Sequence, residues 1–301
     1  MRTARIPILQ LVIFLAITVV ISAGVYGRTP ATGSSGANRV GGSGTIEMVG
    51  AGVDGLTVVR IEGNRYELGY WYGRLLAGQI ASSWQIVQAL TGSVGITEDD
   101  LGNAADALWQ AEIYDTQAWM REFQGAADGC AAAGHPEITV RVLQLLAAVP
   151  DRTEHSCSLF AAWGEATAGD TTYQMRNLDW AMNTGLEDHM VVVAYHPDDG
   201  IEHVVVGIAG ILGAAVGGFN SEGLAVSEIM GHFCDEETLA GEPFPFILRD
   251  ILYFDRDLQA AVSRLENATR TNQYHYAVAD PAAADPKARL LMTSHSRFDV
   301  Y

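Results

Sequence analysis

The stretch HSCSLFAAWGEATAGDTTYQMRNLDW, residues 155–180, decides the fold of this chain. An apolar run from Ser158 to Trp163 and an alternating run from Thr171 to Met175 predict two β-strands. The segment Ala168-Gly169-Asp170 between them predicts a turn, so the two strands should form a hairpin. A hairpin brings its two open ends together, and the residues at these ends should therefore meet in space.

A cysteine stands at one open end of this hairpin, and an arginine and a carboxylate stand at the other: Cys157, Arg176 and Asp179. A guanidinium beside a thiol lowers the pKa of that thiol, and the thiolate is the nucleophilic form. Taken alone, each residue has a simpler interpretation, because free cysteines are commonly buried and an arginine near an aspartate is commonly a surface ion pair. The stretch as a whole is more specific than its parts.

The stretch contains two short motifs on either side of the turn: Cys157-Ser158 in the first strand and Arg176-Asn177-Leu178-Asp179-Trp180 at the end of the second. On these residues the stretch resembles the N-terminal-nucleophile (Ntn) hydrolases, in particular the autoproteolytic acyltransferase/hydrolase family that includes isopenicillin N acyltransferase (peptidase family C45). The resemblance extends to GNRYELGYWYGRLLAGQI at residues 63–80 and to FQGAADGCAAAG at residues 123–134. It implies an α+β fold, the αββα sandwich, in which two stacked antiparallel sheets are covered by helices.

In this family the chain cuts itself immediately before the nucleophile, which here would be the bond between Ser156 and Cys157. The new α-amine of Cys157, with a pKa of about 8, would then be the general base for its own thiol. In this mechanism Asp179 positions the α-amine and Arg176 favours the thiolate. His155 is an alternative general base, but cleavage would remove it from the terminus of the active chain.

A second resemblance lies in GGFNSEGLA, residues 217–225, between two apolar runs. The segment resembles the family's Gly-x-Asn-x-x-Gly-Leu-Ala motif, whose asparagine, here Asn220, helps to form the oxyanion hole. A donor in that position stabilises the tetrahedral intermediate by about 3 kcal/mol. The alternative is that Asn220 is only a turn residue. No metal or organic cofactor is expected for this chemistry.

The composition limits the kinds of partner. The 301 residues carry a formal net charge of −18, which argues against nucleic acid, because binding phosphates requires basic patches. An acidic enzyme and an acidic binding domain both fit this charge. Three cysteines are too few for a disulfide framework, and we expect Cys130 and Cys234 to be structural. The histidines in or beside predicted strands are expected to be hydrogen-bonded and not metal ligands: His189, His203 and His275.

The N-terminal residues 1–27 carry two arginines followed by an apolar run, which predicts an export signal. Either a cleaved signal peptide or an uncleaved signal anchor fits, because about 20 apolar residues can span a bilayer. Residues 28–44 are rich in Gly, Ser, Thr and Ala and predict a flexible linker. The body should therefore lie outside the cytoplasm, membrane-anchored or secreted.

The remaining chain divides at the predicted cut into a helical N-terminal segment, residues 45–156, and a catalytic segment, residues 157–301. Apolar periodicity predicts helices from residue 65 onward and over residues 98–124, 137–149 and 243–265, with Pro150 ending the third. Strands are predicted over residues 56–61, 190–196, 201–208, 274–279 and 289–293. Family members continue with further strands beyond the position of Tyr301, so the catalytic segment is expected to be incomplete at its C-terminus.

Together these features predict an exported, self-processing N-terminal-cysteine hydrolase or acyltransferase, made as a zymogen, that acts on an amide or acyl bond through a thioester. Its substrate would be a small acyl or amide molecule, and the N-terminal segment would stay as an associated chain. A membrane would be contacted only through the apolar leader. Two alternatives stay open: a peptidase-like or ester-cleaving relative on the same fold, and a catalytically dead, membrane-tethered binding domain.

Overall fold

The computed structural model describes residues 40–50, 55–93, 95–110, 112–152, 156–179, 184–231 and 238–301. Among these residues, nine strands form one mixed sheet in the order β1-β2-β5-β6-β7-β8-β9-β10-β11, and β3 pairs only with β4. The strands are β1 (Ser43–Val49), β2 (Leu56–Gly63), β3 (Ser156–Ala162), β4 (Tyr173–Asp179), β5 (Met190–Pro197), β6 (His203–Ile208), β7 (Gly217–Asn220), β8 (Ala225–Met230), β9 (Tyr274–Ala279), β10 (Ala288–Thr293) and β11 (Phe298–Val300).

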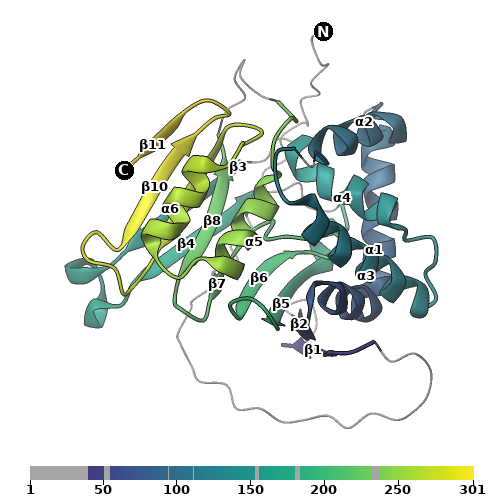
Figure 1. Ribbon diagram of the computed structural model, residues 1–301, viewed down its shortest axis with the longest axis horizontal. Helices are drawn as coiled ribbons and strands as arrows, with labels where there is room; N and C mark the ends of the chain where they lie inside the picture. Colours follow the sequence, from purple (N-terminus) through teal and green to yellow (C-terminus); the bar gives the residue numbers. More distant parts are fainter. Residues whose placement is uncertain are drawn as a thin grey trace.

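The helices fall into two groups (Figure 1). Four of them follow β2 and gather on one side of the molecule, whereas the other two lie across the sheet beside β8 and β10. The first group is α1 (Arg65–Ser93), α2 (Glu98–Leu108), α3 (Thr116–Ala132) and α4 (Val140–Arg152), and the second is α5 (Phe244–Phe254) and α6 (Leu258–Asn267). Of the parts of the chain that are described, no helix has both the length and the apolar character needed to cross a membrane. The predicted export signal, residues 1–27, lies outside the described residues.

The N-terminal segment contributes strands as well as helices to the fold. Strand β2 pairs in parallel with β5, from Thr57 opposite Val191 to Gly63 opposite Pro197. A parallel pair needs a long crossover connection, and here that connection contains α1–α4 and the β3–β4 hairpin. Residues 45–156 and 157–301 therefore share one sheet, and the N-terminal segment is not only a helical cap.

The predicted α+β class is confirmed, but the predicted pair of stacked antiparallel sheets is not what the described residues form. They form one large mixed sheet and one two-stranded hairpin. The physical reason is that β2 joins the large sheet in parallel through its crossover, while both edges of the β3–β4 hairpin have no described strand beside them.

The hairpin at residues 156–179 is confirmed, with β3 and β4 antiparallel from Ser156 opposite Asp179 to Ala162 opposite Tyr173. Its turn contains Gly169 with a φ of 72°, a left-handed conformation that glycine adopts without strain. The far end is tied to the β9–β10 loop, because Trp163 Nε1 donates to Asp285 Oδ1 at 2.6 Å. These contacts fix the hairpin against the large sheet.

Two predicted helices are each broken into two. Residues 98–124 form α2 and α3, and residues 243–265 fall in α5 and α6. In each case an aspartate starts the second helix: Asp115 accepts from the backbone N–H of Gln117 and Ala118, and Asp257 accepts from that of Ala260. Aspartate is a favoured N-cap because its carboxylate satisfies free N–H groups of the first turn.

The prediction that Pro150 ends its helix is wrong, because α4 continues to Arg152 with Pro150 in its last turn. That turn is tied to the loop before β9. Asn272 Nδ2 donates to Asp151 O at 2.9 Å, and Thr271 Oγ1 donates to Asp151 Oδ1 at 2.6 Å. These tertiary hydrogen bonds hold the last turn of α4 in place, although Pro150 contributes no backbone N–H to the helix.

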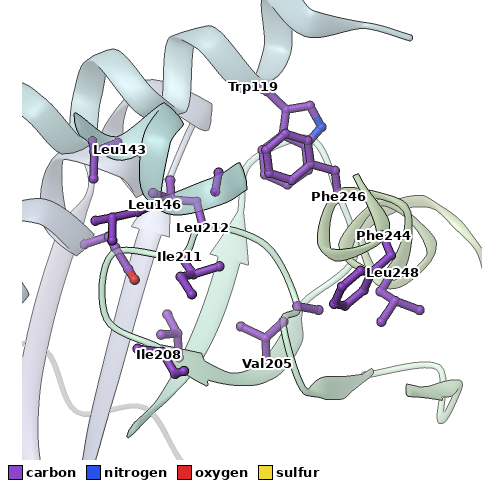
Figure 2. Close-up of a cluster of buried hydrophobic side chains, with 14 of the residues drawn as sticks. Trp119, Leu143, Leu146, Val205, Ile208, Ile211, Leu212, Phe244, Phe246 and Leu248 are labelled. Atoms are coloured by element: carbon purple, nitrogen blue, oxygen red, sulfur yellow. The ribbon is translucent and has the colours of Figure 1, made fainter. Parts of the chain in front are cut away.

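The core joins the two groups of helices (Figure 2). Trp119 of α3 stacks on Phe246 of α5, with ring centroids 4.0 Å apart and an interplanar angle of 13°. Leu146 of α4 lies near Ile211 and Leu212, which follow β6. Because this apolar contact crosses the boundary at residue 157, both segments depend on it for stability.

Candidate active site

Cys157 lies at the open end of the hairpin, opposite Leu178. Side chains alternate between the faces of a strand, so Cys157 and Leu159 share one face of β3. Arg176 is opposite Leu159, which makes it the diagonal neighbour of Cys157 on that same face. This face is turned toward β8, because Arg176 hydrogen-bonds to Glu228 there. The structure therefore brings the thiol and the guanidinium together as the sequence predicted.

The guanidinium of Arg176 is buried and held in place by a single residue. Its Nε donates to the backbone oxygen of Glu228 at 3.0 Å, and its Nη2 donates to Glu228 Oε1 at 2.9 Å. The remaining nitrogen, Nη1, is buried and has no hydrogen-bond partner among the described residues. Two bonds thus fix the direction of the guanidinium and leave one nitrogen for another group.

Sequence analysis missed Glu228, which is fully buried in β8. A signal was present, since a glutamate in the apolar strand AVSEIM must be paired if it is buried. The sequence alone could not name its partner, because Arg176 lies 52 residues earlier in the chain.

The pKa of the Cys157 thiol is raised to about 11, and burial is the largest cause. Arg176 lowers the pKa, as does a backbone hydrogen bond from Asp179, while Glu228 raises it. The predicted effect of Arg176 is therefore present, but the prediction of a lowered thiol pKa is wrong for the uncut chain. Removal of the charged form from water outweighs the attraction of the neighbouring guanidinium.

Asp179 ends β4 directly opposite Ser156, the first residue of β3. The alternation of side chains places its carboxylate on the face opposite the Cys157 thiol. There Asp179 Oδ1 accepts from Asn177 Nδ2 at 2.6 Å. The carboxylate thus lies on the strand position opposite the predicted cleavage site, and its charge raises the pKa of the Cys157 thiol. His155 and Trp180, which flank the two strands, lie outside the described residues.

Asn220 is not brought together with these residues. Its Nδ2 donates to Leu252 O at 3.2 Å and to Asp255 O at 2.9 Å, at the end of α5. Its Oδ1 accepts from the backbone N–H of Glu222 and Leu224 in the turn before β8. Both ends of the amide are therefore occupied, as in the turn-residue alternative, and the oxyanion role of Asn220 stays a prediction.

Cys130 and His203, both among the described residues, have structural surroundings. Cys130 is buried in α3, and burial raises the pKa of its thiol to about 12. His203 is hydrogen-bonded as predicted, with Nδ1 2.7 Å from Ile201 O, and burial lowers its pKa. Cys234 lies outside the described residues. Within the described ranges, no group of three or more His, Cys, Asp or Glu side chains could hold a metal ion.

Comparison with known proteins gives a family match over residues 166–296, to acyl-coenzyme A:6-aminopenicillanic acid acyl-transferase. The matched residues include Arg176, Asp179, Asn220 and Glu228, and they begin after Cys157.

Two relatives come from Dictyostelium discoideum. Protein dcd1B is 26% identical over 269 residues, which are 82% of this chain and 51% of the relative. Protein dcd1A is 25% identical over 259 residues, which are 76% of this chain and 56% of the relative. The chain thus spans about half the length of the curated relatives it matches.

Among solved structures, the chain is similar to the Caenorhabditis elegans ortholog of N-acylethanolamine-hydrolyzing acid amidase, with 22% identity and a TM-score of 0.39. That similarity covers 48% of this chain and 63% of the other. The family match overlaps the later part of the stretch from which the resemblance was first drawn, and residues 166–296 of the chain are similar to the acyl-coenzyme A:6-aminopenicillanic acid acyl-transferase family.

Proposed function

We propose that this chain is a self-processing amidohydrolase or acyltransferase whose nucleophile is Cys157. The observation that carries the proposal is the position of Arg176, a buried guanidinium fixed by Glu228 as the diagonal neighbour of the thiol. The similarity of residues 166–296 to a family named for acyl transfer supports the same reaction class. The substrate class is a small molecule with an acyl group on nitrogen.

The raised pKa of the thiol explains why cleavage would be needed for activity. With a pKa of about 11, the thiol of the uncut chain is protonated at neutral pH. A cut between Ser156 and Cys157 creates an α-amine on the nucleophile itself, with a pKa of about 8. This amine is a base at neutral pH and lies on the residue that must lose the proton.

The proposed reaction proceeds in two halves. The α-amine takes the thiol proton, the sulfur bonds to the acyl carbon, and the carbon–nitrogen bond of the substrate breaks as the proton passes to the leaving amine. Water or another amine then attacks the thioester, the carbon–sulfur bond breaks, and the thiol regains its proton. Arg176 stabilises the negative sulfur, and Asp179 positions the α-amine because it lies opposite Ser156.

The remaining parts of the proposal concern the larger assembly. The β3–β4 hairpin packs on β8 and β9, and we assign it to the second sheet of an αββα sandwich. After cleavage the N-terminal segment stays bound, because β2 remains in the sheet beside β5. An exported location, through a signal peptide or an anchor at residues 1–27, is part of the same proposal.

Mass spectrometry of the purified protein tests the cleavage step. The expected result is a chain that begins Cys157-Ser158-Leu159-Phe160, and the variant C157A should stay intact under the same conditions. The processed protein should then release amine from members of a panel of acyl amides, and alkylation of the thiol should abolish this turnover.

The alternatives give different results in the same experiment. Cleavage followed by faster turnover of esters or peptides than of acyl amides would favour the peptidase-like or ester-cleaving relative. An intact wild-type chain without thiol-dependent turnover would contradict the proposal and favour a binding domain.

A further inference from the structure

A second polar side chain of β4, Gln174, joins the hairpin to the large sheet. Its Nε2 donates to Ser227 Oγ at 2.8 Å and to Ala277 O at 3.2 Å. Ser227 and Ala277 are opposite each other in β8 and β9, so one amide group binds two neighbouring strands. Gln174 lies two residues before Arg176 and therefore on the same face of β4.

The orientation of the Gln174 amide follows from its partners. A backbone carbonyl can only accept a hydrogen bond, so the nitrogen end of the amide must face Ala277. Both N–H groups are then used, one on each strand. The oxygen end is buried and has no partner among the described residues. Among the described residues, the side chain is consequently hydrogen-bonded through its nitrogen alone, to one residue of β8 and one of β9.

We propose that Gln174 is a positioning residue for the thiol, because it fixes β4 on β8 and β9 and so sets where Arg176 stands relative to Cys157. Arg176 is bound to β8 at Glu228, one residue beyond the Ser227 contact. These two neighbouring attachments hold the middle of β4 on β8 and β9, and the bond from Trp163 to Asp285 holds the far end of the hairpin. The inference rests on the proposed role of Cys157 as nucleophile.

The test compares Q174M and S227A with a matched control, Q79M. Gln79 in α1 is also a partly buried glutamine whose Nε2 donates to a side-chain hydroxyl, that of Thr57 at 3.1 Å, and whose Oε1 is buried without a described partner. Methionine keeps the length of the side chain and removes its hydrogen bonds. The rate at which iodoacetamide alkylates Cys157 is followed by peptide mass spectrometry from about pH 7 to 10. In this pH range the alkylation rate is controlled by the fraction of Cys157 that is thiolate.

In Q174M the Cys157 alkylation rate should fall about threefold to tenfold at each pH, because a displaced Arg176 stabilises the thiolate less. A thiol pKa that is higher by one unit corresponds to a thiolate fraction about tenfold lower. In S227A the loss should be smaller, since the Ala277 carbonyl still binds Gln174. In Q79M the rate should equal that of the wild type, even if its melting temperature falls as far as that of Q174M. An unchanged or faster rate in Q174M, or an equal loss in Q79M, would overturn the inference.

Variants are compared in the same processing state, which intact mass spectrometry assigns. The measurement needs only the thiol and not turnover. A wild-type chain that never cuts itself, together with a slowed thiol in Q174M, would refute the proposed function and leave the positioning role standing.

Discussion

At the scale of single residues, Asn220 uses both ends of its amide to bind backbone groups of the turn after β7 and of the end of α5. We predict that N220A lowers the free energy of unfolding by about 2–4 kcal/mol, since it leaves buried carbonyl and N–H groups unpaired. Urea unfolding measures this loss. The exposed Asn267, whose Nδ2 bonds only to Ser263 O, gives a control: N267A should change stability by less than about 0.5 kcal/mol.

The opposite outcome would restore the sequence-based role of this residue. If N220A unfolds like the wild type and yet loses turnover without a change in KM, then Asn220 acts on the transition state as an oxyanion donor.

For Cys157 and Arg176, the sequence predicts that the two residues meet but not the pKa of the thiol. The hairpin follows from alternation and turn residues, and from it the meeting of Cys157 and Arg176 follows directly. The net shift of the thiol pKa could not be predicted, because it depends on burial beneath the large sheet and on Glu228, which arrives from a distant strand. Sequence spacing gives neighbours along a hairpin but not the solvent access of the pair.

At the scale of elements, helices α1 and α3 pack with their backbones unusually close. A Cβ added at Gly69 would lie 2.0 Å from Glu122 O, and one added at Gly125 would lie 2.0 Å from Tyr66 O. The glycines one turn later, Gly73 and Gly129, make the same reciprocal contacts. The two glycine-rich motifs noted in the sequence, residues 63–80 and 123–134, are therefore the two sides of one helix contact. The sequence resemblance identified both motifs but did not indicate that they touch.

This contact predicts opposite effects for two glycine-to-alanine changes in α1. G69A should destabilise the protein by about 1–3 kcal/mol or more, because the new methyl group meets backbone that can move only with the whole helix. G78A should stabilise it by about 0.5–1 kcal/mol, because nothing lies within 4 Å of the added Cβ and alanine is the better helix former. Thermal unfolding of the two variants beside the wild type measures both, and a stabilised G69A would contradict the close packing.

At the scale of the whole molecule, a buried ionic network joins the two segments that the predicted cut would separate. Glu122 of α3 accepts from Arg65 of α1 at 3.3 Å and also from Arg249 of α5. Glu122 and Arg249 are fully buried, and Arg65 also pairs with Asp250 at 3.2 Å. The network could not be predicted from sequence, because its members lie up to 185 residues apart and no local pattern connects them.

We predict that R249M lowers the free energy of unfolding by about 3–5 kcal/mol, because it removes one partner of a buried charge and leaves Glu122 undercompensated. The control is R264M, whose partner Asp255 lies in the same segment and whose side chain is one-third exposed. Both variants remove an arginine from an ion pair, but only R249M breaks a pair between segments. The double variant E122Q/R249M should recover much of the loss, since Arg65 keeps Asp250 and no carboxylate stays buried without its partner.

After cleavage, the difference in stability between R249M and R264M becomes a difference in how tightly the two chains associate. In wild-type protein cut before Cys157, the two chains should elute together from a sizing column, because β2 stays paired with β5 and Trp119 stays stacked on Phe246. In R249M the two chains should separate at a clearly lower urea concentration than in R264M. The unpaired charge of Glu122 is buried only while the chains are associated, so it weakens their association. Equal separation midpoints for the two variants would mean that apolar contact and strand pairing alone hold the segments together.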